Sequence, residues 1–385
     1  MQKPINMFDV IICGAGPAGC TAALALGSSG LKVGLIEKER YPREKICGDA
    51  IPAYVPKVLN SISPYYARAF ERLPIKEVVK ICRIVAPNEK VLDLKFSEQG
   101  YICKRMIFDN FLFDLASQLS NLTVFQDTSV MDVKIIDNEV IINSAEDLSF
   151  KARLVIGCDG AHSIIKRILT HTKVDSRHSS EAVRAYFKNV KDIPGATFEL
   201  HFLKNVLPGY FWIFPLPDNY SNVGLGMPSN VISAKRINLR REMAKIIDSV
   251  PYLKQRFSDS EMVSDINGCL LPLGSRKVTI SGNRFMLCGD AASLIDPATG
   301  AGIGQAILAG RYAGWHAVKC FEKNDFSNHF MKRYDKTVYD KLWRHNIFRF
   351  MIRNIINSQP LVLNAAINMS LKSKFIYKTT LRILE

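Results

Sequence analysis

The segment Gly14-Ala15-Gly16-Pro17-Ala18-Gly19 carries the pattern Gly-x-Gly-x-x-Gly. The first glycine permits a tight turn, the second lets a backbone approach a pyrophosphate, and the third lets a helix and a strand pack closely. Free N–H groups at the start of the following helix attract an anion. Glu37, followed by Lys38, ends the next predicted strand, where its carboxylate can accept hydrogen bonds from ribose hydroxyls. The arrangement predicts binding of a dinucleotide with a free 2′-hydroxyl, such as FAD or NAD, and a purely structural turn is the alternative.

A second group of candidate residues follows another apolar run, near residue 285. Asp290, in Cys288-Gly289-Asp290, can accept a hydrogen bond from a polyol hydroxyl at the end of this run. The glycine-rich loop after it leads into a helix, whose N-terminus near Gly302 can stabilise negative charge on the N1–C2=O edge of a reduced flavin. A helix cap followed by a flexible loop is the alternative. The candidate cofactor-binding residues here are Asp290, Pro297, Gly300, Gly302 and Ile303.

A third motif, Gly157-Cys158-Asp159-Gly160, ends a further apolar run, and Ser163 can cap the helix that follows. By itself it indicates either a cofactor contact or a plain join between a strand and a helix.

Apolar periodicity predicts the elements that position these motifs. A strand at Phe8–Cys13, a helix at Pro17–Ser28 and a strand at Lys32–Ile36 form a βαβ unit. Further strands are expected at Ala152–Gly157 and Arg284–Cys288, and helices at Ile107–Leu119 and Ile303–Val318. A chain of 385 residues exceeds what one core usually supports, so two lobes are expected.

In their order along the chain, the three motifs resemble those of the flavoprotein hydroxylase superfamily, typified by para-hydroxybenzoate hydroxylase, over residues 8–320. The resemblance implies one FAD held without a covalent bond, with Asp290 in contact with the ribityl chain. It implies that Asp159 and Gly160 lie near the pyrophosphate. It also implies an FAD contact from Arg105, in KRMIFDNFL. No second Gly-x-Gly-x-x-Gly is present, so NAD(P)H, as electron donor, would dock only transiently.

A narrower resemblance is to the geranylgeranyl reductase branch, whose members reduce isolated carbon–carbon double bonds of isoprenoid chains. It rests on YPREKICGDAIP (41–52), similar to that branch's C-G-[GD] loop, and on PGYFWIFP (208–215) followed by NVGLG (222–226). It implies that Cys47, the tentative catalytic residue, lies beside the isoalloxazine ring; a buried structural thiol is the alternative. It also implies an aromatic-lined substrate pocket containing Tyr210, Trp212 and Phe214, for which an aromatic core is the alternative. Flavin-dependent halogenases have a related W-x-W-x-I-P segment, from which this sequence departs at Tyr210 and Phe214.

The expected fold is α/β, with a Rossmann-type FAD-binding domain interrupted by a mixed-sheet substrate domain and followed by a helical C-terminal tail. The FAD-binding domain takes residues 1–60, 101–180 and 276–325, the substrate domain takes 61–100 and 181–275, and the tail takes 326–385. The expected function is an FAD-dependent oxidoreductase that reduces carbon–carbon double bonds of a hydrophobic, isoprenoid-like small molecule. The alternatives are a flavin-dependent monooxygenase or halogenase acting on an aromatic or polyketide substrate, and a flavin-binding scaffold or electron carrier.

Charge and cysteine content limit the partners. The net charge is +15, and residues 331–385 hold eleven Lys or Arg against three acids. Phe, Ile and Leu lie between these charges, which favours peripheral membrane contact over nucleic acid; a solvated helix face is the alternative. None of the nine cysteines is spaced C-x-x-C, so no metal site is expected, and a reducing cytoplasm is the expected location. Neither a membrane-spanning helix nor a signal peptide is predicted.

Overall fold

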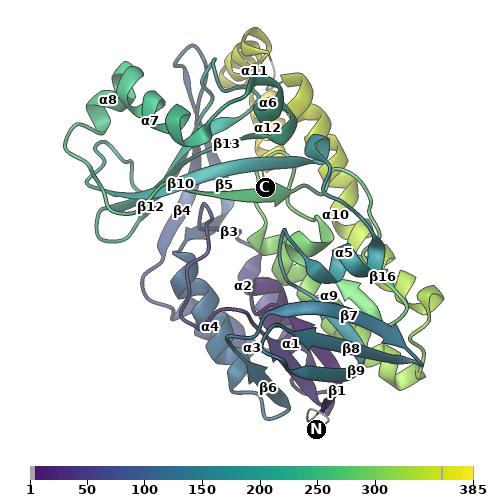
Figure 1. Ribbon diagram of the computed structural model, residues 1–385. Helices are drawn as coiled ribbons and strands as arrows, with labels where there is room; N and C mark the ends of the chain where they lie inside the picture. The colour runs from purple at the N-terminus through teal and green to yellow at the C-terminus, as the bar shows by residue number, and fades with distance from the viewer. Residues whose placement is uncertain (1–4, 357–358, 385) are drawn as a thin grey trace.

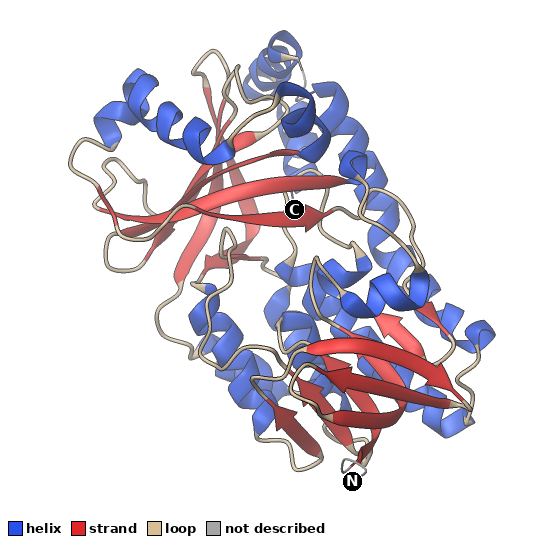
Figure 2. Ribbon diagram, in the orientation of Figure 1, coloured by secondary structure: helices blue, strands red, loops and turns tan. Residues whose placement is uncertain are grey.

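The computed structural model describes residues 5–356 and 359–384, and its strands form two sheets, one above the other in Figure 2. The first is an eight-stranded sheet in the described residues, with the order β16-β17-β9-β1-β2-β6 and with β7 and β8 paired beyond β9. Its strands are β1 (Ile5–Cys13), β2 (Val33–Ile36), β6 (Leu122–Phe125), β7 (Val130–Ile136), β8 (Glu139–Ser144), β9 (Ser149–Gly157), β16 (Ser281–Gly282) and β17 (Phe285–Leu287).

The centre of this sheet is parallel, because β1 pairs in parallel with both β2 and β9. Val10, Ile11 and Ile12 of β1 are fully buried, as expected of a parallel strand covered on both faces. Helix α1 (Pro17–Leu26) joins β1 to β2, which confirms the predicted βαβ unit with ends shifted by a few residues. The other predicted elements are confirmed in the same way as β9, β17, α4 (Arg105–Ser117) and α9 (Ile303–Lys323).

Helices α1 and α9 pack closely because small residues line their contact. A Cβ added to Gly310 of α9 would lie 2.1 Å from the carbonyl oxygen of Ala18, so only glycine permits this approach. Helices α2 (Val55–Ile62) and α3 (Pro64–Glu71) belong to the same core, in which Phe70 is fully buried. The predicted lobe boundaries stay a prediction, although α3, which begins at Pro64 in the predicted substrate domain, packs against α2 and α4 in this core.

The second sheet is largely antiparallel and has nine strands among the described residues, in the order β14-β10-β13-β12-β11-β4-β5-β3, with β15 paired to β10. They are β3 (Ala50–Ile51), β4 (Glu77–Val85), β5 (Val91–Ile102), β10 (Ser179–Lys188), β11 (Thr197–His201), β12 (Tyr210–Leu216), β13 (Tyr220–Pro228), β14 (Glu261–Met262) and β15 (Asn267–Pro272).

The side chains of β12 alternate between two separate cores. Phe211 and Ile213 pack in the core that also contains residues of α7 (Leu239–Ser249) and α8 (Pro251–Arg256). Trp212 and Phe214 lie in the other core of this sheet. The two-residue period of the strand thus places Tyr210, Trp212 and Phe214 on one face of the sheet and Phe211 and Ile213 on the other.

The chain ends in helices, as predicted: α10 (Asn328–Ile356), α11 (Pro360–Lys372) and α12 (Lys374–Leu384). Figure 1 shows α10 running from the level of the first sheet up to the second, where α11 and α12 lie. Leu363 and Ile367 of α11 are buried in the same core as Trp212. No helix in the described residues is both long and apolar enough to span a bilayer.

Candidate active site

A cavity of about 1720 Å³ lies between the two sheets and is lined by residues of both. Every residue predicted from the sequence to form the site lines it, except Gly19 and Pro297. The predicted residues on its wall are Gly14, Gly16, Pro17, Ala18, Glu37, Lys38, Cys47, Arg105, Asp159, Gly160, Tyr210, Trp212, Phe214, Asp290, Gly300, Gly302 and Ile303. Three motifs distant in the sequence therefore meet at one site.

The first glycine-rich turn is shaped by contacts that exclude a side chain. Gly14 has φ +98°, and a Cβ there would lie 2.4 Å from the carbonyl oxygen of Cys158. A Cβ on Gly19 would lie 1.8 Å from the carbonyl oxygen of Gly14, so Gly19 serves packing and not the cavity wall. A Cβ on Gly16 would meet only the Arg43 guanidinium, at 3.7 Å. The start of α1, which no side chain caps, therefore lies open to the cavity.

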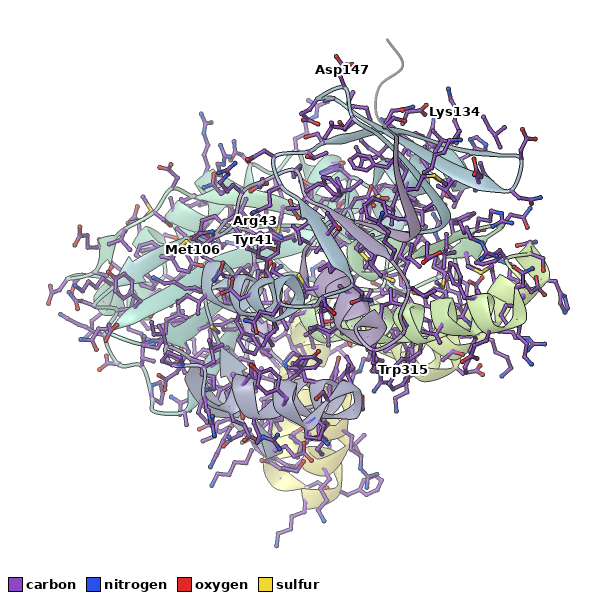
Figure 3. All side chains as sticks on the ribbon, turned by 90° about the horizontal axis from the view of Figure 1, so that it is seen from below. Tyr41, Arg43, Met106, Lys134, Asp147 and Trp315 are labelled. Carbon is purple, nitrogen blue, oxygen red and sulfur yellow. The ribbon has the colours of Figure 1, made fainter. Side chains whose placement is uncertain are left out.

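Glu37 and Arg43 close one end of this turn. Glu37 is buried, and its Oε2 accepts a hydrogen bond from the N–H of Ala15 over 2.8 Å. The Arg43 Nε lies 3.8 Å from Glu37 Oε1, and its guanidinium stacks over the Tyr41 ring at 4.8 Å. Figure 3 shows Tyr41 and Arg43 close together near the start of α4. Sequence reasoning missed Arg43, although it lies within the quoted segment 41–52.

A buried carboxylate holds two arginines at the cavity. Asp109 accepts from the Arg105 Nε over 2.6 Å and from the Arg43 Nη1 over 3.2 Å. Burial would lower the pKa of Arg105, but the charge of Asp109 outweighs burial and the pKa is raised. Both guanidiniums are therefore charged beside the glycine turn, where an anionic ligand would gain from them.

The loop between Cys47 and Asp49 joins the two sheets through polar contacts. Fully buried, Asp49 accepts at Oδ2 from the Tyr186 hydroxyl and from the Asn222 Nδ2, both over 2.8 Å. The Asn222 side chain also donates to the carbonyl of Cys47 over 2.7 Å and accepts from the Trp212 Nε1 over 2.9 Å. Burial raises the pKa of Asp49 to about 6, even though these hydrogen bonds lower it. Asp49, Tyr186 and Asn222 are not among the candidate residues expected from the sequence, although Asp49 and Asn222 lie within the quoted segments 41–52 and 222–226.

Cys47 lies where this loop meets the first sheet. Its side chain lies near the charged Arg105 guanidinium. Next to it, a Cβ on Gly48 would lie 3.2 Å from the Phe214 ring, so the aromatic strand β12 packs directly on the loop. Cys47 is thus placed between the charged end of the cavity and its aromatic wall.

The loop of residues 296–302 forms the opposite edge of the cavity. Asp290, just before it, lies 3.5 Å from the Lys45 ammonium, and α9 begins after Gly302 without a side-chain cap. The loop itself is attached to α10. Asp296 is fully buried and forms an ion pair with Arg349, and Arg353 donates to the carbonyl of Pro297 over 3.2 Å. Pro297 therefore contributes to fixing the loop.

The residues present fit a flavin dinucleotide. A diphosphate is suited by two uncapped helix N-termini, the buried Arg105, the partly buried Arg43 and a glycine turn open to the cavity. The cavity also exceeds the roughly 300–1,000 Å³ usual for one small ligand, so a second molecule fits beside the first. The remaining wall is apolar and includes Val79, Phe96, Phe198, Leu200 and Leu271.

Comparison with known proteins agrees with this geometry. The family described as "FAD binding domain" matches residues 7–337. A digeranylgeranylglycerophospholipid reductase of Thermoplasma acidophilum is 29% identical over 354 residues, which cover 89% of this chain and 86% of the relative.

Two solved structures are also similar. A geranylgeranyl bacteriochlorophyll reductase-like protein from the same organism superposes with a TM-score of 0.83 at 27% identity, over 95% of this chain and 91% of that one. A myxobacterial chondrochloren halogenase, at 21% identity and a TM-score of 0.77 over 92% of this chain and 84% of its own, shares the fold.

Proposed function

The chain belongs to the FAD binding domain family and is an FAD-dependent oxidoreductase, and on this premise we propose that it reduces carbon–carbon double bonds of an isoprenoid-like chain. The observation that carries the proposal is the apolar, aromatic wall that continues directly from the cofactor end of the same cavity. The similarity to a digeranylgeranylglycerophospholipid reductase supports the same substrate class.

The residues that would hold FAD divide into a phosphate end and a ring end. The diphosphate would lie against Gly14, Gly16 and the start of α1, beside Arg43 and Arg105. The ribose would lie beside Glu37. Asp290 suits the ribityl chain, and the start of α9 suits the ring edge that becomes negative on reduction. Bound and reduced, FAD supplies the hydride for the double bond. NAD(P)H is proposed as the transient electron donor.

The substrate would lie against the aromatic wall. Tyr210, Trp212 and Phe214 come from one strand, and Phe96 and Phe198 face the cavity from β5 and β11. An alkyl chain gains about 25 cal/mol for each Å² of apolar surface that it buries, so a long hydrocarbon binds here without polar anchors. The polar contacts of the Trp212 indole and the Tyr210 hydroxyl are made within the protein, to Asn222 and to the carbonyl of Thr299.

Reduction of a double bond also needs a proton for the second carbon, and Tyr186 with Asp49 is placed to supply it. The Tyr186 ring lines the cavity, and its hydroxyl donates to Asp49 when that carboxylate is charged. When Asp49 is protonated it can donate to the Tyr186 oxygen instead, which frees the tyrosine proton for the substrate. Asp49 then acts as a positioning residue that reloads Tyr186. The thiol of Cys47, on the same loop, is the other candidate donor.

An anaerobic single-turnover experiment tests the proposed reaction. The FAD-loaded protein is reduced under argon and mixed with a geranylgeranyl glycerol ether, and flavin absorbance and product mass are recorded. We expect reoxidation only with the substrate present, and a product that has gained one pair of hydrogens, because one reduced flavin carries the two electrons that a single double bond needs. Reoxidation that requires oxygen and gives an oxygenated or halogenated product would refute the proposal in favour of a monooxygenase or halogenase. Loss of the substrate-dependent phase in Tyr186→Phe, with normal FAD content, would support the proton route.

A further inference from the structure

We propose that the outer face of α11 and α12 is a docking surface for an anionic lipid bilayer. Large apolar side chains gather there in solvent: Leu361 is 82% exposed, Phe375 80%, Met369 54%, Leu371 52% and Val362 43%. These five residues form the proposed docking surface. Other exposed large apolar side chains of the described residues are spread from Met7 to Met351. A concentration of this kind within fifteen residues marks an interaction site.

The opposite face of the two helices anchors them to the protein. Leu363 and Ile367 are buried in the core of the second sheet, and the Tyr377 hydroxyl accepts from the backbone N–H of Lys95 over 2.9 Å. The hydroxyls of Ser370 and Thr380 lie 3.1 Å apart and join α11 to α12. The helices are therefore folded in place without the five apolar residues, which remain available to a partner.

The charge around this surface selects an anionic partner. Lys372, Lys374, Lys378 and Arg382 lie exposed on the same two helices. The sequence from Lys341 to Leu384 contains no acidic residue at all. Apolar side chains beside lysine and arginine on a helix pair that cannot span a bilayer are typical of a peripheral membrane surface.

A second copy of this chain fits the surface poorly. A two-fold contact would bring the same cationic helices together, and like charges facing each other oppose such a dimer. A bilayer containing anionic lipid satisfies both the apolar and the cationic side chains. It would also lie close to the cavity, because β5 packs against α11 and α12 through Leu92 and Leu94 and lines the cavity through Phe96.

Vesicle sedimentation with the full-length, FAD-loaded protein tests the surface. The vesicles are phosphatidylcholine with or without phosphatidylglycerol, at low and high salt. We expect retention on the anionic vesicles at low salt only. Phe375→Ser should weaken retention about tenfold through lost apolar burial, and each of Lys372→Gln, Lys374→Gln and Lys378→Gln about fivefold. Met262→Ser, which removes an exposed apolar side chain from β14, is the matched control and should bind as the wild type does.

Equal retention on both kinds of vesicle, retention on neither, or retention that survives Phe375→Ser and the lysine variants would each overturn the proposal. So would a dimer in solution that Phe375→Ser dissociates, because the surface would then belong to a second copy. The experiment contains no substrate and no turnover. Failure of the proposed reduction therefore leaves its outcome unchanged, and failure of vesicle binding leaves the single-turnover result unchanged.

Discussion

Replacement of Asp49 by asparagine should make the folded protein more stable at neutral pH and leave it nearly unchanged in acid. The Asp49 carboxyl is fully buried, and its Oδ1 has no hydrogen-bond partner among the described residues. Burial raises its pKa from 3.8 to about 6, which corresponds to roughly 3 kcal/mol at 1.36 kcal/mol per pKa unit. Asparagine keeps an oxygen for Tyr186 and Asn222 and carries no charge at any pH.

The direction in which the stability difference changes with pH follows from proton uptake by Asp49. Because the pKa of Asp49 is higher in the folded than in the unfolded chain, the folded protein binds more protons between about pH 4 and pH 6. This group therefore destabilises the wild type progressively as the pH rises through that window, and fully above it. We expect the gain in Tm of Asp49→Asn over wild type to grow by about 4 °C between pH 4 and pH 7, for a chain of this length.

Thermal unfolding of the FAD-saturated proteins across this pH range measures the difference. All other titrating groups cancel between the two proteins. Asp218→Asn is the matched control, because Asp218 also has a positive φ, +61°, but is exposed. A Tm difference for Asp49→Asn that stays constant with pH, or that shrinks as the pH rises, would refute the reasoning.

Three further predictions concern the cofactor end of the cavity. Gly14→Ala should weaken FAD binding at least tenfold in a flavin fluorescence titration, since its Cβ would meet a carbonyl oxygen at 2.4 Å; Gly30→Ala, with a positive φ but open space, should bind normally. Asp290→Ala should release FAD on gel filtration, and full occupancy would contradict its assigned role. Arg349→Ala should destabilise the protein by about 3–5 kcal/mol in urea, because Asp296 is left buried and unpaired, and adding Asp296→Asn should restore part of the loss.

Local sequence was sufficient for the central parallel strands of the first sheet, β17, β9, β1 and β2, and for the glycine turn. The pattern at residues 14–19 admits few geometries, because a Cβ at Gly14 or Gly19 would clash with backbone carbonyls. The resemblance at residues 208–215 implied an aromatic-lined pocket, and the two-residue period of β12 explains why Tyr210, Trp212 and Phe214 share one face of the strand.

The polar network around Asp49 could not be predicted in the same way. Tyr186 and Asn222 lie 137 and 173 residues beyond Asp49, and they meet it because they are directly paired across β10 and β13. That register is a tertiary property of two antiparallel strands. Arg43 and Asp109, 66 residues apart, likewise come together only when the loop packs on α4.

The attachment of α10 to the loop of residues 296–302 limits where a chimera between this protein and a relative can be joined. Arg349 and Arg353 belong to the C-terminal region, yet their partners Asp296 and Pro297 border the cofactor end of the cavity. A chimera that received its last sixty or so residues from a relative would leave a carboxylate stranded in the interior unless the loop came with them. The transplantable unit is therefore the continuous stretch that begins with this loop and includes α9 and α10, and a crossover point is best chosen before residue 296 rather than in the turn that precedes α10.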